Sequence, residues 1–228
     1  HNQSRRQRQM CIRDRFHSAK EGSIYVDNST VSAEVSRELY SKAKEKGFAF
    51  LDAPISGGQS GAEGGILTVM VGGDEEVFKK AEPVIDCYSK KVKLIGPSGS
   101  GQLTKMMNQM CIAGVVQGLS EAINFGINAG LDIDKVMETI SKGAAQSWQM
   151  ENRYKTMVED KFDYGFAVDW MRKDLKIVIE EAKRNGSPVP ITEIVDEYYA
   201  DVQKMGGNRW DSSSSVSYTH LRAHETET

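Results

Sequence analysis

The sequence predicts an α/β domain followed by an all-helical domain. Strand, helix and strand patterns alternate along the first part of the chain, as in a βαβ unit. Beyond residue 97 the strand patterns stop and apolar residues recur at helical spacing. We therefore expect residues 16–97 to form the α/β part and residues 98–215 to form the helical part.

The α/β part begins with two short apolar runs and a helix between them. SIYV, residues 23–26, is predicted to be a buried strand, and Ser32 is a good N-cap for the following helix, which Gly47 ends. FAFLDAP, residues 48–54, is predicted to be the second strand. One βαβ unit does not complete a sheet, so we expect that earlier βα units belong to the natural protein.

A glycine-rich stretch follows, DAPISGGQSGAEGGILTVMVGG, residues 52–73. Its glycines alternate with a compact apolar run, which indicates an ordered hairpin or a strand, loop and strand rather than a flexible loop. The turn at Ser56, Gly57 and Gly58 presents backbone N–H groups without side-chain obstruction, so it is a candidate site for a carboxylate or a phosphate. The helix EEVFKKAEPVIDCY and the strand KVKLIG complete the α/β part.

The stretch GPSGSGQLTKMMNQM, residues 96–110, is predicted to be a glycine turn that opens a long helix, which Gly130 ends. Lys105 lies one turn before Asn108 and Gln109, so the three side chains share a helix face. Most lysines near a helix start are solvated, so this pattern alone does not identify a site. We expect a buried core helix, because its apolar residues lie on several faces: Met106, Met110, Val115, Leu119, Ile123 and Ile127.

The rest of the helical part contains three further helices and a linker. LDIDKVMETISKG is a short helix with Asp132 or Asp134 as its cap, and a polar linker with Trp148 and Tyr154 follows it. FAVDWMRKDLKIVIEEAKRNG is an amphipathic helix that Gly186 ends, and ITEIVDEYYADVQKMGG is the last helix.

The two ends of the chain are expected to differ in origin from the rest. QRQMCIRDR, residues 7–15, and VSYTHL, residues 216–221, can be encoded by opposite strands of one DNA element, which resembles a sequencing adapter. We therefore expect residues 1–15 and 216–228 to be translation artefacts. They hold 6 of the 29 Lys and Arg and 3 of the 32 Asp and Glu, so the remaining 23 basic and 29 acidic residues give a charge of about −6 rather than −3. No basic stripe remains, and no nucleic acid partner is expected.

Histidine and cysteine are scarce in the remaining chain. His17 is its single histidine, so a Ser/His or Cys/His catalytic pair is nearly excluded. Cys87 and Cys111 have neither metal-ligand spacing nor a disulfide framework, so no metal site is predicted and a reducing compartment, the cytoplasm, is expected. No run approaches the ~18 apolar residues of a membrane span, so no membrane partner is expected.

Four motifs, in this order, resemble those of one family. DNSTVS (residues 27–32), the stretch of residues 52–73, GPSGSGQLTKMMNQ (96–109) and MRKDL (171–175) are similar to motifs of the β-hydroxyacid dehydrogenases, the relatives of 3-hydroxyisobutyrate dehydrogenase. The resemblance covers nearly all of residues 16–215. It implies that the α/β part is the remnant of a Rossmann-like dinucleotide-binding domain. The helical part would be a substrate and dimerisation domain, similar to the C-terminal domain of 6-phosphogluconate dehydrogenase.

The resemblance also implies a reaction, the transfer of a hydride between NAD or NADP and a small 3-hydroxy acid. Lys105 would be the general acid/base, which takes the hydroxyl proton as the hydride leaves the carbinol carbon. A lysine suits this role because the alcohol needs a base within hydrogen-bond reach and histidine is not available. Ser56, Gly57 and Gly58 would hold the substrate carboxylate.

Other motif residues would line the same site, which is expected where the two domains meet. Ser29 and Thr30 would lie on the nicotinamide side. Lys173 and Asp174 would close the site near cofactor and substrate.

One position departs from the family pattern. The family often has asparagine four residues after the lysine, where this chain has Gln109, while Asn108 stands three residues after it. Either amide could orient the substrate hydroxyl, and we favour Asn108.

The GxGxMG fingerprint of the family is absent from this chain, so the choice between NAD and NADP cannot be read. The chain as given is expected to be inactive and unable to bind a dinucleotide. The alternatives are a reductase of the same family for tartronate, succinic or glyoxylic semialdehyde, and a catalytically inactive binding or oligomerisation module. Lys105 disfavours an imine reductase. A homo-oligomer is expected, because the family uses long helices of this kind to build dimers and tetramers.

Overall fold

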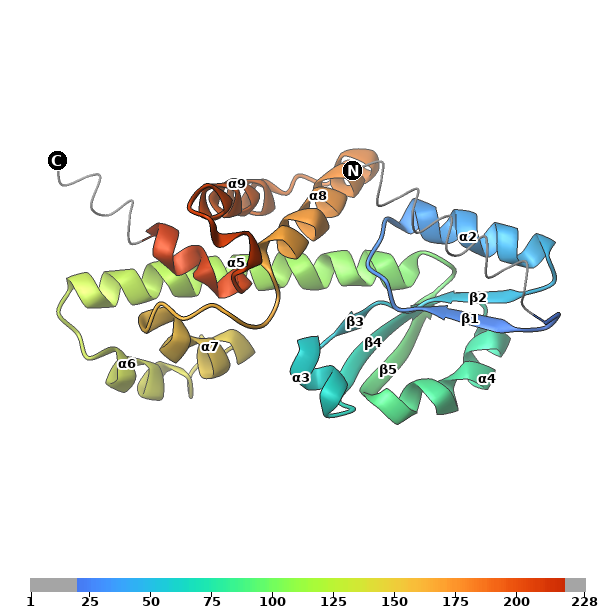
Figure 1. The fold of residues 1–228 in the computed structure, drawn as a ribbon, viewed down its shortest axis with the longest axis horizontal. Helices are drawn as coiled ribbons and strands as arrows, with labels where there is room; N and C mark the ends of the chain where they lie inside the picture. Colours follow the sequence, from blue (N-terminus) through green and yellow to red (C-terminus); the bar gives the residue numbers. More distant parts are fainter. Residues whose placement is uncertain (1–19, 220–228) are drawn as a thin grey trace. The chain divides into compact units, whose positions relative to one another are not determined.

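The computed structural model describes residues 20–219 and divides the chain into two compact units, His1–Lys105 and Met106–Thr228. The long helix α5, Ser100–Asn128, begins in the first unit and continues into the second (Figure 1). The predictions made for residues 1–19 and 220–228, including the N-terminal artefact and His17, lie outside the described residues.

The first unit is built on a mixed sheet whose strands follow the order β1-β2-β4-β3, with β5 paired to β4. β1 and β2 are parallel, as are β4 and β5, whereas β3 and β4 are antiparallel. The parallel pair β1 and β2, joined by a helix, confirms the predicted βαβ unit. The strands are Ile24–Asp27 (β1), Ala49–Asp52 (β2), Ile55–Ser56 (β3), Leu67–Gly72 (β4) and Ser89–Gly96 (β5).

Helices cover both faces of this sheet. α2, Ala33–Glu45, packs its apolar face against Phe50 of β2, while α4, Glu75–Ile85, packs against the neighbouring Leu51. Successive side chains of a strand point to opposite faces, so the two helices lie on opposite sides (Figure 1). A short 3-10 helix η1, Asp86–Tyr88, follows α4.

The boundaries of α2 follow from its terminal residues. The hydroxyl of Ser32 accepts a hydrogen bond from the backbone N–H of Val35, which satisfies one of the free donors at the helix start. Gly47 has a φ of 74°, a left-handed conformation that ends the helix. Both features confirm the sequence prediction.

The segment between β3 and β4 contains a short helix, α3 (Gly58–Glu63), which the sequence analysis did not predict. The residue of α3 that faces the sheet is Gly61, which is buried. A Cβ at that position would lie 3.1 Å from the side chain of Leu67, so there is little room for a larger residue. A helix that turns glycine toward the sheet has no apolar periodicity, and this explains why the pattern indicated a loop.

The second unit is helical. α8 ends at Gly186, which has a φ of 75°, and Asp132 rather than Asp134 caps α6 through the backbone N–H of Lys135. Residues 215–219 continue the last 3-10 helix as a helical segment. Beyond α5, the elements are Ile133–Ile140 (α6), Trp148–Val158 (α7), Val168–Asn185 (α8), Pro190–Lys204 (α9), Gly207–Arg209 (η2) and Ser212–Ser214 (η3).

The predicted polar linker that contains Trp148 and Tyr154 is wrong, because this segment forms α7. The hydroxyl of Ser147 caps the helix by accepting a hydrogen bond from the backbone N–H of Met150. Met150 and Met157, seven residues apart, are its buried side chains. Two methionines in a polar sequence gave too weak a periodic signal for the helix to be predicted.

The prediction that α5 is buried along its length is wrong for part of the helix. Met106, Leu119 and Ile123 are buried, but Val115 and Ile127 are 41% and 42% exposed. By length and composition alone α5 could cross a membrane, which the sequence analysis did not anticipate, and 39% of its most apolar stretch is buried inside the protein. A core helix with one uncovered apolar face has the same composition.

The serine run Ser212–Ser215 and the residue after it pack into the second unit. The hydroxyl of Tyr199 donates to the carbonyl oxygen of Ser212 at 2.9 Å, and the hydroxyls of Ser120 and Ser215 lie 2.8 Å apart. Val216 is fully buried in a cluster with residues of α5, α6 and α7. The origin of residues 216–228 as an artefact stays a prediction.

Candidate functional site

A buried carboxylate holds the start of α5. The side chain of Asp52, at the end of β2, is 0% exposed. Its Oδ1 accepts from the backbone N–H of Gly99 at 2.7 Å and its Oδ2 from that of Gln102 at 3.1 Å. The hydroxyl of Ser98 donates to Oδ1 at 3.3 Å. The first N–H groups of a helix have no partner within the helix, and the carboxylate provides one.

Burial and hydrogen bonding act on Asp52 in opposite directions. Burial raises the pKa of this carboxyl above its ordinary value of 3.8, while the hydrogen bonds from Gly99, Gln102 and Ser98 lower it. Burial is the larger effect, so the pKa of Asp52 is raised.

The glycines of this region allow the backbone to approach the carboxylate. A Cβ at Gly72 would lie 2.8 Å from both carboxylate oxygens of Asp52. A Cβ at Gly101 would lie 2.4 Å from the carbonyl oxygen of Met70 and 2.7 Å from that of Asp52. The backbone at these two glycines therefore approaches Asp52 and β4 more closely than a side chain would allow.

Gln102 connects the same helix start to the loop after β1. Its side chain is fully buried, its Nε2 donates to the carbonyl oxygen of Ser29 at 2.8 Å, and its Oε1 accepts from the backbone N–H of Val31 at 3.1 Å. The sequence analysis singled out neither Asp52 nor Gln102. The available signals were an acidic residue at the end of a buried strand and an amide on an apolar helix.

Lys105 lies one helical turn after Gln102 and is 6% exposed. Lysines are almost never this deeply buried without a function or a partner, so the burial distinguishes Lys105 from a solvated surface lysine. In the loop after β1, Ser29 and Thr30 are half-buried, and the backbone N–H of Ser29 donates to Oδ1 of Asp27 at 3.0 Å.

The predicted anion turn is exposed on the same unit. Ser56 ends β3, where it pairs with Thr68 of β4. Gly57 and Gly58 are exposed and have φ angles of 134° and 62°. Residues other than glycine rarely adopt such φ angles.

Four of the predicted site residues form one hydrogen-bonded group in the second unit. Gln109, 2% exposed, donates from Nε2 to Oδ2 of Asp174 at 2.8 Å and accepts from Nδ2 of Asn108 at 2.8 Å. Nζ of Lys173 lies 2.7 Å from the other oxygen of Asp174. Both ends of the Gln109 amide are therefore occupied. Within the described part of the chain, Oδ1 of Asn108 accepts no hydrogen bond.

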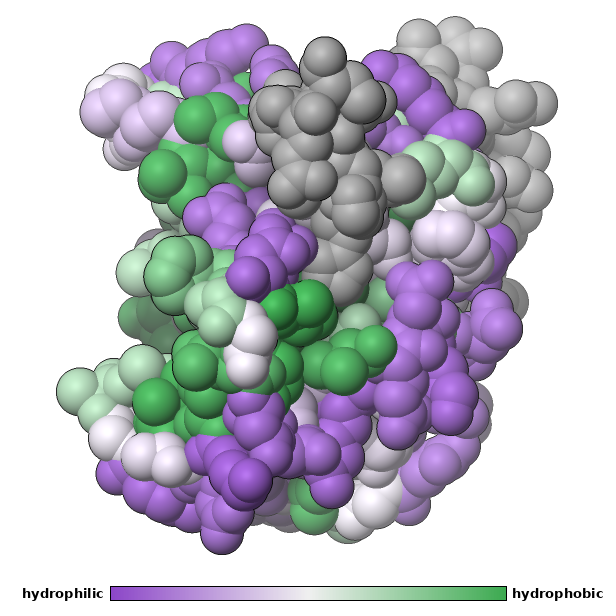
Figure 2. Space-filling view, turned by 90° about the vertical axis from the view of Figure 1, so that its left-hand side faces the viewer, coloured by the Kyte–Doolittle hydropathy of each residue, from purple (hydrophilic) through white to green (hydrophobic). Residues whose placement is uncertain are grey.

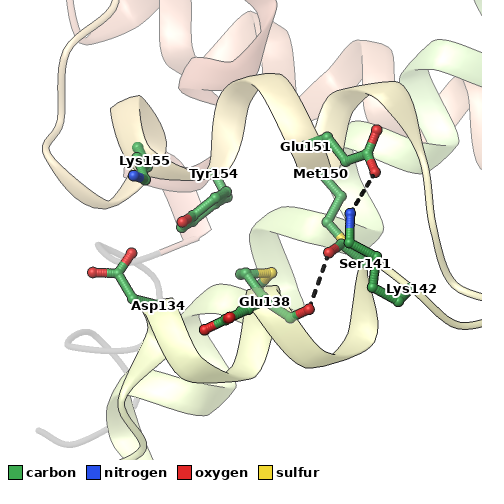
Figure 3. Close-up of a pocket in the computed structure, with 9 residues that line it drawn as sticks. Asp134, Glu138, Ser141, Lys142, Met150, Glu151, Tyr154 and Lys155 are labelled. Atoms are coloured by element: carbon green, nitrogen blue, oxygen red, sulfur yellow. Dashed lines mark hydrogen bonds and ion pairs between the residues drawn. The ribbon is translucent and has the colours of Figure 1, made fainter.

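A separate hollow of about 570 Å³ lies between α6 and α7, and none of the predicted site residues lines it (Figure 3). Met137 and Met150 contribute apolar surface, and the ion pair between Lys142 and Glu151, 3.4 Å apart, lies at its edge. Among residues 20–219, no group of His, Cys, Asp and Glu could hold a metal ion.

Two families match the chain, one for each part. Residues 4–96 match the NAD binding domain of 6-phosphogluconate dehydrogenase. Residues 99–219 match the family described as the NAD-binding domain of NADP-dependent 3-hydroxyisobutyrate dehydrogenase. Together these matches cover both the α/β part and the helical part.

Several relatives are similar over most of the chain. An uncharacterized oxidoreductase of Shewanella frigidimarina is 60% identical over 87% of this chain and 68% of its own length. The 2-hydroxy-3-oxopropionate reductase of Escherichia coli is 34% identical over 89% of this chain and 70% of its own length. Among solved structures, the 3-hydroxyisobutyrate dehydrogenase of Mycobacterium tuberculosis with L-serine is 27% identical, with a TM-score of 0.81 over 91% of this chain and 74% of that one. The chain thus spans about two thirds of the length of its relatives.

Proposed function

The chain belongs to the β-hydroxyacid dehydrogenase family, and from this premise we propose that the complete protein transfers a hydride between NAD or NADP and a small 3-hydroxy acid of the 3-hydroxyisobutyrate type. Lys105 is its general acid/base. The observation that carries the proposal is the burial of Lys105 at the start of α5, one turn after a helix start held by Asp52.

Oxidation of an alcohol removes a hydride from the carbinol carbon and a proton from the hydroxyl. A bound nicotinamide would supply the hydride acceptor. Neutral Lys105 accepts the proton, and in the reverse direction its ammonium group returns the proton to the carbonyl oxygen. Residues 20–219 contain no histidine that could do this instead.

The substrate carboxylate is proposed to bind at Ser56, Gly57 and Gly58. The exposed turn with two glycines of positive φ supports this, because it lets an anion approach the backbone without meeting a side chain. A turn of this kind recognises an acid group and leaves the rest of the substrate unspecified.

Asn108 is proposed to orient the substrate hydroxyl. The amide of Gln109 is occupied by Asp174 and Asn108, whereas the carbonyl oxygen of Asn108 can still accept a hydrogen bond. Asp174 then acts by holding Gln109, and Lys173 by pairing with Asp174.

The cofactor is proposed to meet the chain at Ser29 and Thr30. They follow β1 at the carboxyl end of a parallel strand pair, the edge at which α/β sheets bind ligands. The 228 residues contain no GxGxMG fingerprint, so we propose that they do not bind a dinucleotide by themselves. Saturable NADH or NADPH binding to the purified chain would disprove this.

The second candidate is a reductase that acts on tartronate semialdehyde or a related acid. The 34% identity to 2-hydroxy-3-oxopropionate reductase favours it, and it needs the same carboxylate turn and the same lysine. The two candidates differ in the substrate rather than in the roles of these residues.

A homo-oligomer is proposed on the basis of uncovered apolar surface. Figure 2 shows apolar residues gathered on one face among hydrophilic ones. On α5, Met107 and Phe125 are 66% and 73% exposed, in addition to Val115 and Ile127. Apolar patches of this kind mark association surfaces. The free thiols Cys87 and Cys111 are compatible with the reducing cytoplasm as the proposed location.

The test of the proposed function uses the complete gene product. The formation of NADH and NADPH would be followed with 3-hydroxyisobutyrate, glycerate and serine as substrates. The oxidation of NADH and NADPH would be followed with the matching semialdehydes. Turnover that disappears in Lys105→Ala supports the proposal. A folded Lys105→Ala protein with the activity of the parent contradicts it.

A further inference from the structure

We infer that Asp52 and Gln102 are positioning residues, which fix Lys105 relative to the loop of Ser29 and the turn of Ser56. The inference rests on the proposed role of Lys105 as the general acid/base. The residues that carry it lie in the first unit, His1–Lys105.

Asp52 fixes the orientation of the helix as well as its position. Its two oxygens bind different N–H groups, Oδ1 that of Gly99 and Oδ2 that of Gln102. Two separate attachment points limit the rotation of the first turn of α5 about the helix axis. Asp52 is also three residues before Ile55, the first residue of the strand that carries Ser56, so the same carboxylate ties the helix to the proposed carboxylate turn.

Gln102 provides the second connection. Its backbone N–H is bound by Asp52, while both ends of its side-chain amide bind the loop at Ser29 and Val31. Lys105 is three residues further along and therefore on the same side of α5. One residue thus joins the proposed nicotinamide loop, the end of β2 and the helix of Lys105.

The local helix caps of this protein show that stability alone does not need such an arrangement. α2, α6 and α7 are each capped by a side chain three residues before the bound N–H: Ser32, Asp132 and Ser147. At α5 the capping carboxylate is 47 and 50 residues away in the sequence and fully buried. Burial of a charge is unfavourable, so a long-range buried cap is the less stable choice unless the connection itself is used.

The experiment compares three variants of the complete protein. Asp52→Asn keeps the shape but turns an amide N–H₂ toward a backbone N–H, and Gln102→Met keeps the length but removes both hydrogen bonds to the loop. Tyr199→Phe is the control, because it removes a buried hydrogen bond to Ser212 in the second unit. The probe is 3-hydroxyisobutyrate with deuterium at the carbinol carbon, or glycerate or serine labelled in the same way if the substrate panel identifies one of them.

The expected result is a kcat that falls about 10- to 100-fold in Asp52→Asn and Gln102→Met, with a smaller change in KM. The deuterium isotope effect on kcat should rise, because the chemical step becomes rate-limiting. Tyr199→Phe should lower the stability of the protein and leave kcat and the isotope effect unchanged. A purely structural role would make all three variants behave like the control.

Lys105→Ala, measured in parallel, separates the two claims. If it is active, the proposed function fails and the positioning inference fails with it. If it is inactive while Asp52→Asn and Gln102→Met keep kcat and isotope effect, only the positioning inference is overturned. Should Asp52→Asn not fold, Gln102→Met and Gln102→Glu decide in its place, since they leave the helix cap intact.

Discussion

The two ends of α5 are built differently. At its start, glycines let the backbone approach Asp52, and the buried polar residues Gln102 and Lys105 face inward. In its second half, Val115, Phe125 and other large apolar residues are exposed. Most of the exposed large apolar residues of α5 lie in its far half, whereas its start is held by buried polar contacts. The comparison is compatible with the two proposals made above, catalysis at the start of the helix and association at its far half.

The largest expected effect is at the start of the helix. Lys105→Ala in the complete protein should lower kcat about 10²- to 10⁴-fold, the range that general acid/base groups contribute. Steady-state kinetics with the best substrate of the panel measures it. Lys176→Ala, a half-exposed lysine of α8, should change kcat little and serves as the matched control.

Two glycine substitutions on α5 test the difference between its ends directly. Gly101→Ala should destabilise the protein by about 1–3 kcal/mol, because its Cβ would overlap backbone oxygens of Met70 and Asp52. A Cβ at Gly118 would have no atom within 4 Å, so Gly118→Ala should stabilise the protein by about 0.5–1 kcal/mol. Urea unfolding gives both values, and equal effects of the two substitutions would remove the distinction.

The far half of α5 is tested by Phe125→Glu. Because this side chain is 73% exposed, the free energy of unfolding of one chain should change by no more than about 0.5 kcal/mol. The oligomer, measured by light scattering, should dissociate. An unchanged mass at equal concentration would show that this surface is not used for association.

The smallest expected effect is a pH dependence at the start of the helix. Burial raises the pKa of Asp52 in the folded protein, so its contribution to stability is fully present below 3.8 and is lost as the pH rises through the folded value. The stability of the parent relative to Asp52→Asn should therefore fall as the pH rises from 3.8. Urea unfolding of both proteins at several pH values measures it, and an increase of this difference with pH would contradict the assignment.

The sequence was sufficient to predict the structure where a single local feature determines it. Ser32 and Gly47 bound α2, and the motif around Lys105 was visible because the residues are adjacent. It was insufficient where distant residues meet. Asp52 receives its role from Gly99 and Gln102, about fifty residues later, and no local pattern indicates such a partner.

Burial was the other property that the sequence did not determine. Val115 and Ile127 have the composition of core residues, but the chain itself leaves them uncovered. Met150 and Met157 are buried in a helix that is otherwise polar. In both cases the neighbouring elements, rather than the residue types, decide which side is covered.

The central claim is that Lys105 transfers the proton, and amine rescue of Lys105→Ala tests it most directly. Small primary amines, added to the complete variant with substrate and cofactor, should restore part of the activity in proportion to the free amine base. The restored rate should rise with pH as the amine loses its proton. Two results would contradict the role of Lys105. One is a folded variant that binds NADH or NADPH but is not rescued by any amine. The other is a variant that is fully active without an added amine.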